Sequence, residues 1–166
     1  MLQQSFEAGW CYIPPPTEFR PDKVTGSLWQ GIINLGIGSL TPEQLTMMFN
    51  NLPVDTTYVD KNDEVCYFSD VKDRIFHRSK AIVGRKVQNC HPPESVHIVN
   101  EIVDAFRRGQ KDQANFWIQM KDRFICINYF AIRNEKGEYK GTIEVTQDVT
   151  EIRQLKGERR LLEWNK

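Results

Sequence analysis

The feature that most constrains the fold is a series of three long β-strand patterns in the C-terminal half of the chain. The patterns predict strands over 114–120, 123–133 and 140–148. Lys121-Asp122 forms a tight hairpin turn, and a longer turn over 134–138 contains Gly137, which can take positive φ. The middle strand is apolar on both faces, which is typical of a central antiparallel strand covered on both sides. This part of the chain therefore predicts an antiparallel sheet.

Two shorter strands are predicted earlier in the chain. Residues 56–59 and 64–68 are rich in β-forming side chains, and the four polar residues between them form a turn. The segment over 70–90 mixes charged and apolar residues, and we expect short helical turns and loops there. The two strands form a hairpin that brings the expected sheet to about five strands.

Two helices are predicted from their end signals. The first starts at Thr41, which forms a capping box with Gln44, and it ends before Pro53. The second opens at Pro92-Pro93 and ends at Gly109. The element order predicts an α+β fold with a five-stranded antiparallel sheet, helices on one face, an N-terminal arm and a C-terminal helix.

Charge and cysteine usage exclude several classes of protein. Lys+Arg and Asp+Glu both number 22, so the net charge is zero and we expect no nucleic acid partner. No apolar window of about 18 residues is present, so we expect no membrane partner. The four cysteines form no C-x-x-C pair, and we expect no metal site. Without an export signal, we interpret the cysteines as reduced thiols of a cytoplasmic protein.

The chain divides into three parts. Residues 1–40 contain three consecutive prolines and read as a linker, or as an arm that packs Trp10 and Trp29 on a neighbour. Residues 41–150 form the domain. Residues 151–166 are amphipathic, and we interpret them as a signalling or dimerisation helix, although Gly157 weakens it.

The domain resembles a PAS domain. The hairpin YVDKNDEVCYFS over 58–69, the helix entry VGRKVQNCHPPE over 83–94 and the final strand GTIEVTQDVT over 141–150 follow the PAS motifs in order. The resemblance covers about 110 residues, and it implies a sensory module whose cavity lies between the sheet and the helical middle segment.

A closer resemblance is to the C-terminal PAS domain of an uncharacterised bacterial family that also carries a hemerythrin-like (HHE) cation-binding domain. It rests on RIF at 74–76, CHPPESV at 90–96, FWI at 116–118 and RRLL at 159–162. With His77, His91 and His97 as its only histidines, the chain cannot supply a hemerythrin di-iron site. The resemblance implies a fragment or truncated relative, with a hemerythrin-like partner domain in full-length relatives and residues 1–40 as the interdomain linker.

The candidate ligand residues are polar groups expected around the cavity. Arginines of the middle segment can hold an anion, and polar residues on apolar strands can fix a ligand. For each residue, a structural hydrogen bond or ion pair is the alternative. Large aromatic side chains (Phe116, Trp117, Phe124, Tyr129 and Phe130) can also fill the cavity and leave a ligand-free module. The candidates are Arg74, Arg78, Arg85, Cys90, His91, Asn128 and Gln147.

We expect neither haem nor flavin, and the ligand is unknown. Cys90 and His91 are adjacent and point apart, so they do not form a nucleophilic dyad, and His91 is expected to bind nearby backbone. The GxNCRFLQ motif of flavin-binding light sensors is absent. His97 falls on the polar side of its helix, where we expect it to be solvated.

The sequence therefore predicts a sensory or regulatory module that binds a small ligand and signals through a homodimer. The expected dimer contacts are the outer sheet face and the terminal helices. The alternative is a ligand-free protein-interaction module. An enzyme is not expected, because no Ser/His/Asp set, P-loop or HExxH motif is present.

Overall fold

The computed structural model describes residues 31–160, which form two compact units that divide after Met47, within helix α1 (Pro42–Asn51). In the first unit, β1 (Ile33–Asn34) and β2 (Ser39–Leu40) form a small antiparallel hairpin. Gly36 in its turn has φ +85°, a conformation that favours glycine. The segment predicted as a linker or arm thus contains a short hairpin, and its role as a linker or arm stays a prediction. The predicted roles of Trp10, Trp29 and the prolines lie outside the described residues.

The start of α1 confirms the predicted capping box. The Thr41 amide donates to Oε1 of Gln44 at 2.8 Å, and the Gln44 amide donates to Oγ1 of Thr41 at 3.1 Å. The two side chains thus satisfy amides that the first helical turn leaves without intrahelical partners. The helix ends at Asn51, just before Pro53.

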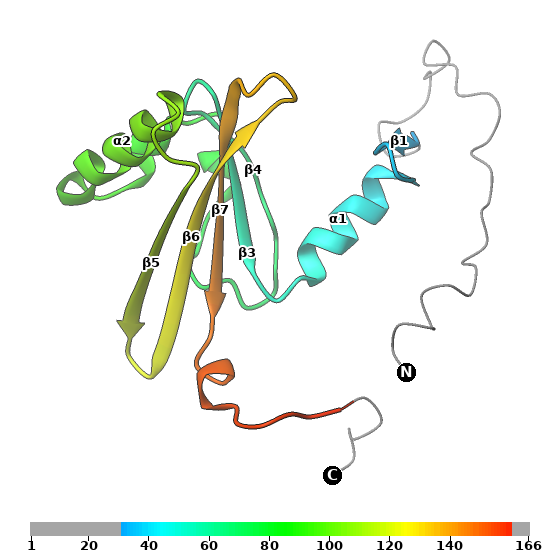
Figure 1. Cartoon of the computed structure of the whole chain (residues 1–166), viewed down its shortest axis with the longest axis vertical. Helices are drawn as coiled ribbons and strands as arrows, with labels where there is room; N and C mark the ends of the chain where they lie inside the picture. The colour runs from blue at the N-terminus through cyan, green and yellow to red at the C-terminus, as the bar shows by residue number, and fades with distance from the viewer. Residues whose placement is uncertain (1–30, 161–166) are drawn as a thin grey trace. The chain divides into compact units, whose positions relative to one another are not determined.

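The second unit contains the predicted five-stranded antiparallel sheet (Figure 1). The order across the sheet is β4 (Val65–Phe68), β3 (Asp55–Asp60), β7 (Tyr139–Asp148), β6 (Arg123–Arg133) and β5 (Gln113–Met120). This order confirms the α+β fold class. It corrects one detail, because the central strand is β7 and not β6. The final strand pairs with β3 on one side and β6 on the other.

Helix α2 (Pro93–Arg107) and the short turns η3 (Lys80–Ile82) and η4 (Val87–Cys90) follow the hairpin. Proline at the start of α2 and a positive φ of +69° at Gly109 after its end confirm the predicted boundaries. Nη2 of Arg133 donates to the Phe106 carbonyl oxygen at 2.7 Å, which satisfies an acceptor in the last helical turn. Neither helix of the described part has the length and apolar composition needed to cross a bilayer.

The two faces of the sheet differ in what they contact. Residues opposite one another in the register share a face, so Thr57, Glu144 and Tyr129 lie on one face, which we call the inner face. The helix α2 and η4 meet this face and enclose a small cavity against it. The opposite face, the outer face, carries Ile143 and Phe130. The buried core lies on the inner side, at Val59, Val65, Val103, Phe106 and Ile125.

The C-terminal segment corrects the predicted helix over 151–166. A single turn, η5 (Ile152–Gln154), follows the last strand, and no further helix forms up to Arg160. Gly157 has φ +66°, which is incompatible with a continuing right-handed helix. The rest of the predicted helix, residues 161–166, lies outside the described residues.

Candidate functional site

An ion pair between Arg78 and Glu144 lies at the centre of the inner face. Nη2 of Arg78 is 3.1 Å from Oε2 of Glu144, and the side chains are only 12% and 11% exposed. The Thr146 hydroxyl donates to Oε1 of Glu144 at 3.2 Å. Buried charges are costly unless they are paired and hydrogen-bonded, and this pair is not fully satisfied. Nε of Arg78 is buried and has no hydrogen-bond partner among the described residues.

A small cavity lies beside this pair, between α2 and the sheet. Its volume is about 30 Å³, and its polar lining comes from His91, Tyr129, Thr142 and Glu144. Burial lowers the pKa of His91, the Arg78 guanidinium lowers it further and the Glu144 carboxylate opposes the shift. Burial and the same carboxylate raise the pKa of Tyr129. The cavity lining is therefore mostly apolar, with a few polar groups from His91 and the sheet.

The cavity corrects the expected role of His91. The histidine was predicted to bind nearby backbone at the helix entry. Its ring instead lines the cavity, and no backbone partner for it is present within residues 31–160. Of the predicted ligand residues, the structure thus brings Arg78 and His91 together around Glu144, a residue that the sequence analysis did not single out.

Arg74 has a structural role. Its guanidinium donates to the carbonyl oxygens of Phe76 at 3.0 Å and Ser69 at 2.5 Å, and to the Thr57 hydroxyl at 3.1 Å. It also lies 4.0 Å from the buried Asp55 carboxylate. With three nitrogens already donating, Arg74 ties the middle segment to β3 and has little capacity left for a ligand.

Arg85, Cys90 and His97 do not contribute to the cavity. Arg85 is exposed, and its backbone oxygen accepts from the Val65 amide at 2.9 Å. The Cys90 thiol lies 3.7 Å from the Lys86 carbonyl oxygen. His97 is exposed, as predicted for a solvated histidine.

Asn128 and Gln147 lie on the outer face, away from the cavity. By register, Asn128 is opposite Val145, and Gln147 is opposite Cys126. Nδ2 of Asn115 donates to Oδ1 of Asn128 at 2.5 Å, which is a cross-strand structural bond. Neither residue lines the cavity that α2 covers, because the pattern separates two faces without showing which one α2 covers; Gln147 instead lines the open groove described below.

The large aromatic side chains are also divided between the faces. Tyr129 lines the cavity as predicted. Trp117, Phe124 and Phe130 belong to the outer face, and Phe116 lies on the inner side away from this cavity. Tyr129 is therefore the one large aromatic side chain among the residues that line the cavity.

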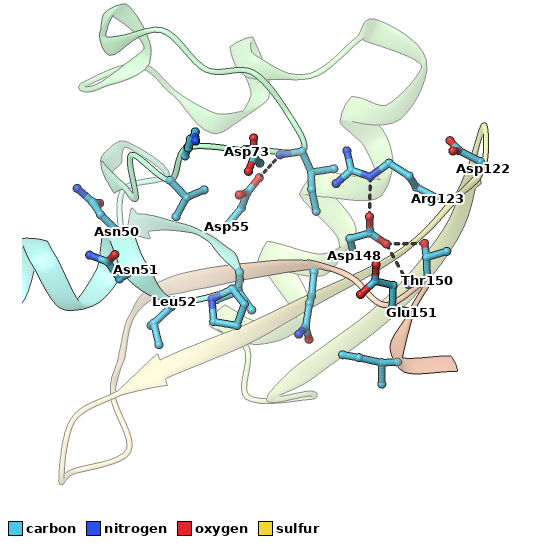
Figure 2. Close-up of a pocket in the computed structure, with 17 residues that line it drawn as sticks. Asn50, Asn51, Leu52, Asp55, Asp73, Asp122, Arg123, Asp148, Thr150 and Glu151 are labelled. Carbon is cyan, nitrogen blue, oxygen red and sulfur yellow. Dashed lines mark hydrogen bonds and ion pairs between the residues drawn. The ribbon is translucent and has the colours of Figure 1, made fainter. Parts of the chain in front are cut away.

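A second polar cluster joins the end of β7 to the hairpin of β5 and β6 (Figure 2). Nε of Arg123 is 2.6 Å from Oδ2 of Asp148, and the Thr150 hydroxyl donates to Oδ1 of Asp148 at 2.5 Å. The Phe124 amide donates to the Thr150 hydroxyl at 2.7 Å. The Thr150 and Arg123 hydrogen bonds lower the pKa of Asp148 to about 2. The cluster fixes the direction in which the chain leaves the sheet.

This cluster borders an open groove of about 790 Å³. Figure 2 shows Asp122, Asp148 and Glu151 on one side and Asn50 and Asn51 on the other. The sequence analysis read Asp148 and Thr150 only as part of the family motif and missed Arg123. Their proximity depends on strand pairing, which no local pattern reveals.

Neither haem nor flavin fits the cavity between α2 and the sheet. Sites for organic ligands typically enclose about 300–1,000 Å³, whereas this cavity encloses about 30 Å³. Among the described side chains, no cluster of three or more His, Cys, Asp or Glu residues is suited to a metal ion.

Comparison with known proteins places this geometry in a family. The PAS domain family model matches residues 45–150. A crystal structure of a C-terminal domain from Streptococcus mutans is 32% identical, with a TM-score of 0.72, covering 77% of this chain and 99% of that one. No curated protein matches the chain.

Two more distant PAS domains share the fold. The PAS domain of a protein from Colwellia psychrerythraea is 21% identical, with a TM-score of 0.50 over 66% of this chain and 97% of that one. The PAS domain of BvgS from Bordetella pertussis is 16% identical, with a TM-score of 0.51 over 68% and 88%. With the five-stranded sheet, the family match shows that this chain belongs to the PAS domain family.

Proposed function

We propose that residues 45–150 form a sensory or regulatory module that responds to a small polar molecule in the cavity beside Glu144 and signals through dimer contacts. PAS domains are typically sensory modules, and we propose no catalytic role here. The observation that carries the proposal is the ion pair between Glu144, which lines the cavity, and the buried Arg78 guanidinium beside it, whose Nε has no hydrogen-bond partner among residues 31–160. Leaving a buried donor unsatisfied costs about 1–3 kcal/mol, so a ligand that accepts from it gains stabilisation.

The cavity volume limits the ligand to a few non-hydrogen atoms. About 10–15 Å³ is enough to hold one water molecule, and the cavity encloses about 30 Å³. His91 and Tyr129 offer further hydrogen-bonding groups on its wall. A larger ligand requires α2 to move away from β7.

The signal is proposed to travel along β7. Glu144 and Asp148 lie on the same strand and, being four residues apart, on the same face. A ligand that moves Glu144 can therefore shift β7 relative to β6 and disturb the Arg123–Asp148–Thr150 cluster at the exit. A ligand changes the conformational equilibrium only by its differential affinity for the two states, so the position of Glu144 must be coupled to the state of the Asp148 cluster at the end of β7.

A ligand-free protein-interaction module is the second candidate. It is favoured by the small cavity together with the exposed apolar residues Phe130 and Ile132 on the outer face. In this alternative, the Arg78–Glu144 pair only holds the middle segment on the sheet. The proposed partner is a second copy or another protein domain, and not nucleic acid or a membrane.

A hemerythrin-like partner domain is proposed for the full-length relatives. The related structure from Streptococcus mutans is a C-terminal domain, which supports a module that follows other domains. We also propose a cytoplasmic location. The upstream coding sequence tests the domain proposal, since an HHE region in the same reading frame supports it.

Native mass spectrometry of the purified full chain tests ligand binding. A retained mass of a few non-hydrogen atoms supports the first candidate. Thermal unfolding with formate and with formamide, two probes of equal size and different charge, then tests the site. We expect one of the two probes to raise the melting temperature of the wild-type chain. The same probe should leave the melting temperature of Arg78→Met unchanged, and it should raise that of Arg123→Met as much as that of wild type. Absence of both a retained mass and a probe effect supports the ligand-free candidate.

A further inference from the structure

Strand β5 (Gln113–Met120) ends the sheet with an unprotected edge (Figure 1). Within the second unit, no further strand pairs with its outer side. Such an edge presents unpaired N–H and C=O groups, which natural proteins usually protect with charges, proline, a bulge or a covering segment. The sequence of β5, QANFWIQM, has no charge and no proline, and its register with β6 has no bulge.

The opposite edge of the same sheet is protected. Strand β4 has four residues, and its pairing with β3 contains a register shift. The segment over 84–87 also runs along it, since the Val65 amide donates to the Arg85 carbonyl oxygen at 2.9 Å and the Gly84 amide donates to the Val65 carbonyl oxygen at 2.8 Å. Of the two edge strands in the described five-stranded sheet, β5 is therefore the one that no described segment pairs along its outer side.

The three central side chains of β5 are apolar and exposed, and they lie on both faces of the sheet. Phe116 and Ile118 on the inner side are 38% and 40% exposed, and Trp117 on the outer side is 66% exposed. Three consecutive large apolar residues on a sheet edge indicate an interaction surface, and not a solvated strand.

A groove between α2 and β5 extends this surface on the inner side. It encloses about 230 Å³ and is lined by Ile98, Ile102, Ala105 and Phe116, among others. An apolar side chain on a neighbouring strand, opposite Phe116, would lie next to this groove. A strand that pairs with β5 should therefore carry an aliphatic residue opposite Phe116.

We propose that β5 pairs in an antiparallel manner with β5 of a second copy, in the register centred on Trp117. This register places Trp117 opposite Trp117 of the second copy and Phe116 opposite Ile118 of the second copy, next to the groove. Paired positions share a sheet face, as a two-fold axis normal to the sheet requires. None of the positions over 114–120 is charged, so the pairing brings no like charges together on the strands.

Closure of the assembly also favours a second copy. Pairing through β5 uses the same edge of both copies, which is an isologous contact. The β4 edge is short and is paired at Val65 with the segment over 84–87, so it is a poorer edge for further extension of the sheet than β5. The expected product is a dimer with a continuous ten-stranded sheet, and not a fibre.

This inference deepens the proposed function and rests on it only for the idea that dimer contacts carry the signal. It places the contact on the β5 edge, and not on the outer face with the terminal helices. Each copy buries few large side chains in this contact, so the buried area lies near the lower end of the range for stable interfaces. We therefore expect a dissociation constant of roughly 10 µM.

Disulfide trapping in the full chain tests the register. In antiparallel pairs, opposite Cα atoms are about 4.5–5.5 Å apart, within the range that a disulfide spans. We expect Trp117→Cys to cross-link into a dimer under mild oxidation, above the background of the wild-type thiols. Phe130→Cys is the matched control, because it lies one strand away from the edge and should not cross-link. Cross-linking by Phe130→Cys and not by Trp117→Cys would instead support an outer-face dimer and overturn the proposal.

Sedimentation velocity provides the second test. We expect Trp117→Lys to weaken dimerisation at least tenfold, because two lysines would face each other, while circular dichroism stays native since Trp117 is exposed. Phe130→Lys should leave the dimer intact. A wild-type chain that remains monomeric at about 500 µM, far above the expected constant, overturns the proposal. Ligand retention in native mass spectrometry does not depend on either result, so this inference and the ligand proposal can fail separately.

Discussion

Removing the charge of Glu144 should strongly destabilise the domain. Glu144→Gln leaves the Arg78 guanidinium buried without a carboxylate, at a site where the two side chains are 12% and 11% exposed. Breaking a buried ion pair costs about 3–5 kcal/mol, and the retained amide oxygen places this variant near about 3 kcal/mol. At about 4 °C per kcal/mol for a domain of this size, the melting temperature should fall by about 12 °C.

Two further variants make this prediction specific to burial. Glu64→Gln removes a carboxylate from the Lys86–Glu64 pair, which has a similar separation of 3.3 Å but is 49% and 45% exposed. Exposed pairs contribute little, so the loss should stay below about 0.5 kcal/mol. The double variant Arg78→Met, Glu144→Leu replaces the whole pair with apolar side chains and should lie within about 1 kcal/mol of wild type.

Urea unfolding followed by circular dichroism measures all three free energies of unfolding. The reasoning is refuted if Glu144→Gln and Glu64→Gln lose the same free energy, because burial then makes no difference. It is also refuted if the double variant is less stable than Glu144→Gln, since the pair would then stabilise the fold by itself.

Three more predictions follow from single contacts. Gly141→Ala should cost about 2–4 kcal/mol in urea unfolding, because a Cβ there would collide with the Val59 carbonyl oxygen; a native-like midpoint would contradict this. The pKa of His91 is lower in the folded chain than in the unfolded chain. The unfolded chain therefore binds the extra proton first, and the free energy of unfolding should fall as pH drops below about 6.5. His91→Phe should flatten the dependence of this free energy on pH below about 6.5, and an unchanged slope would contradict the prediction. Between pH 3.8 and about 2, wild type should lose the stability that the Asp148 carboxylate contributes, and Asp148→Asn should lack this loss. The variant should also exchange the Thr150 amide faster. Identical stability profiles of wild type and variant in acid would exclude a stabilising role for the Asp148 carboxylate.

The strands were predictable because they depend on local patterns. Alternation and turn chemistry located β6 at residues 123–133 and placed β5 and β7 within one residue. The central position of β7 was not predictable, since Thr142, Glu144 and Thr146 make one of its faces look solvent-exposed. That face is buried because Arg78 neutralises Glu144 across 66 positions of sequence.

The candidate site was only partly predictable for a related reason. The sequence separates the two faces of β6 correctly, with Asn128 beside Phe130, but the face that α2 covers depends on the three-dimensional path of the middle segment. Arg74 and Arg78 look alike in sequence. One is saturated by backbone oxygens and the other retains an unpartnered Nε, and this difference arises from folded geometry alone.

The decisive experiment for a ligand beside Glu144 is a crystal structure of the purified full chain, read from the electron density in the cavity between His91, Tyr129 and Glu144. We expect an intact Arg78–Glu144 pair, with water or a molecule of a few atoms accepting a hydrogen bond from Nε of Arg78. Density for a large organic cofactor between α2 and β7, or an Arg78 side chain directed into solvent, would contradict it.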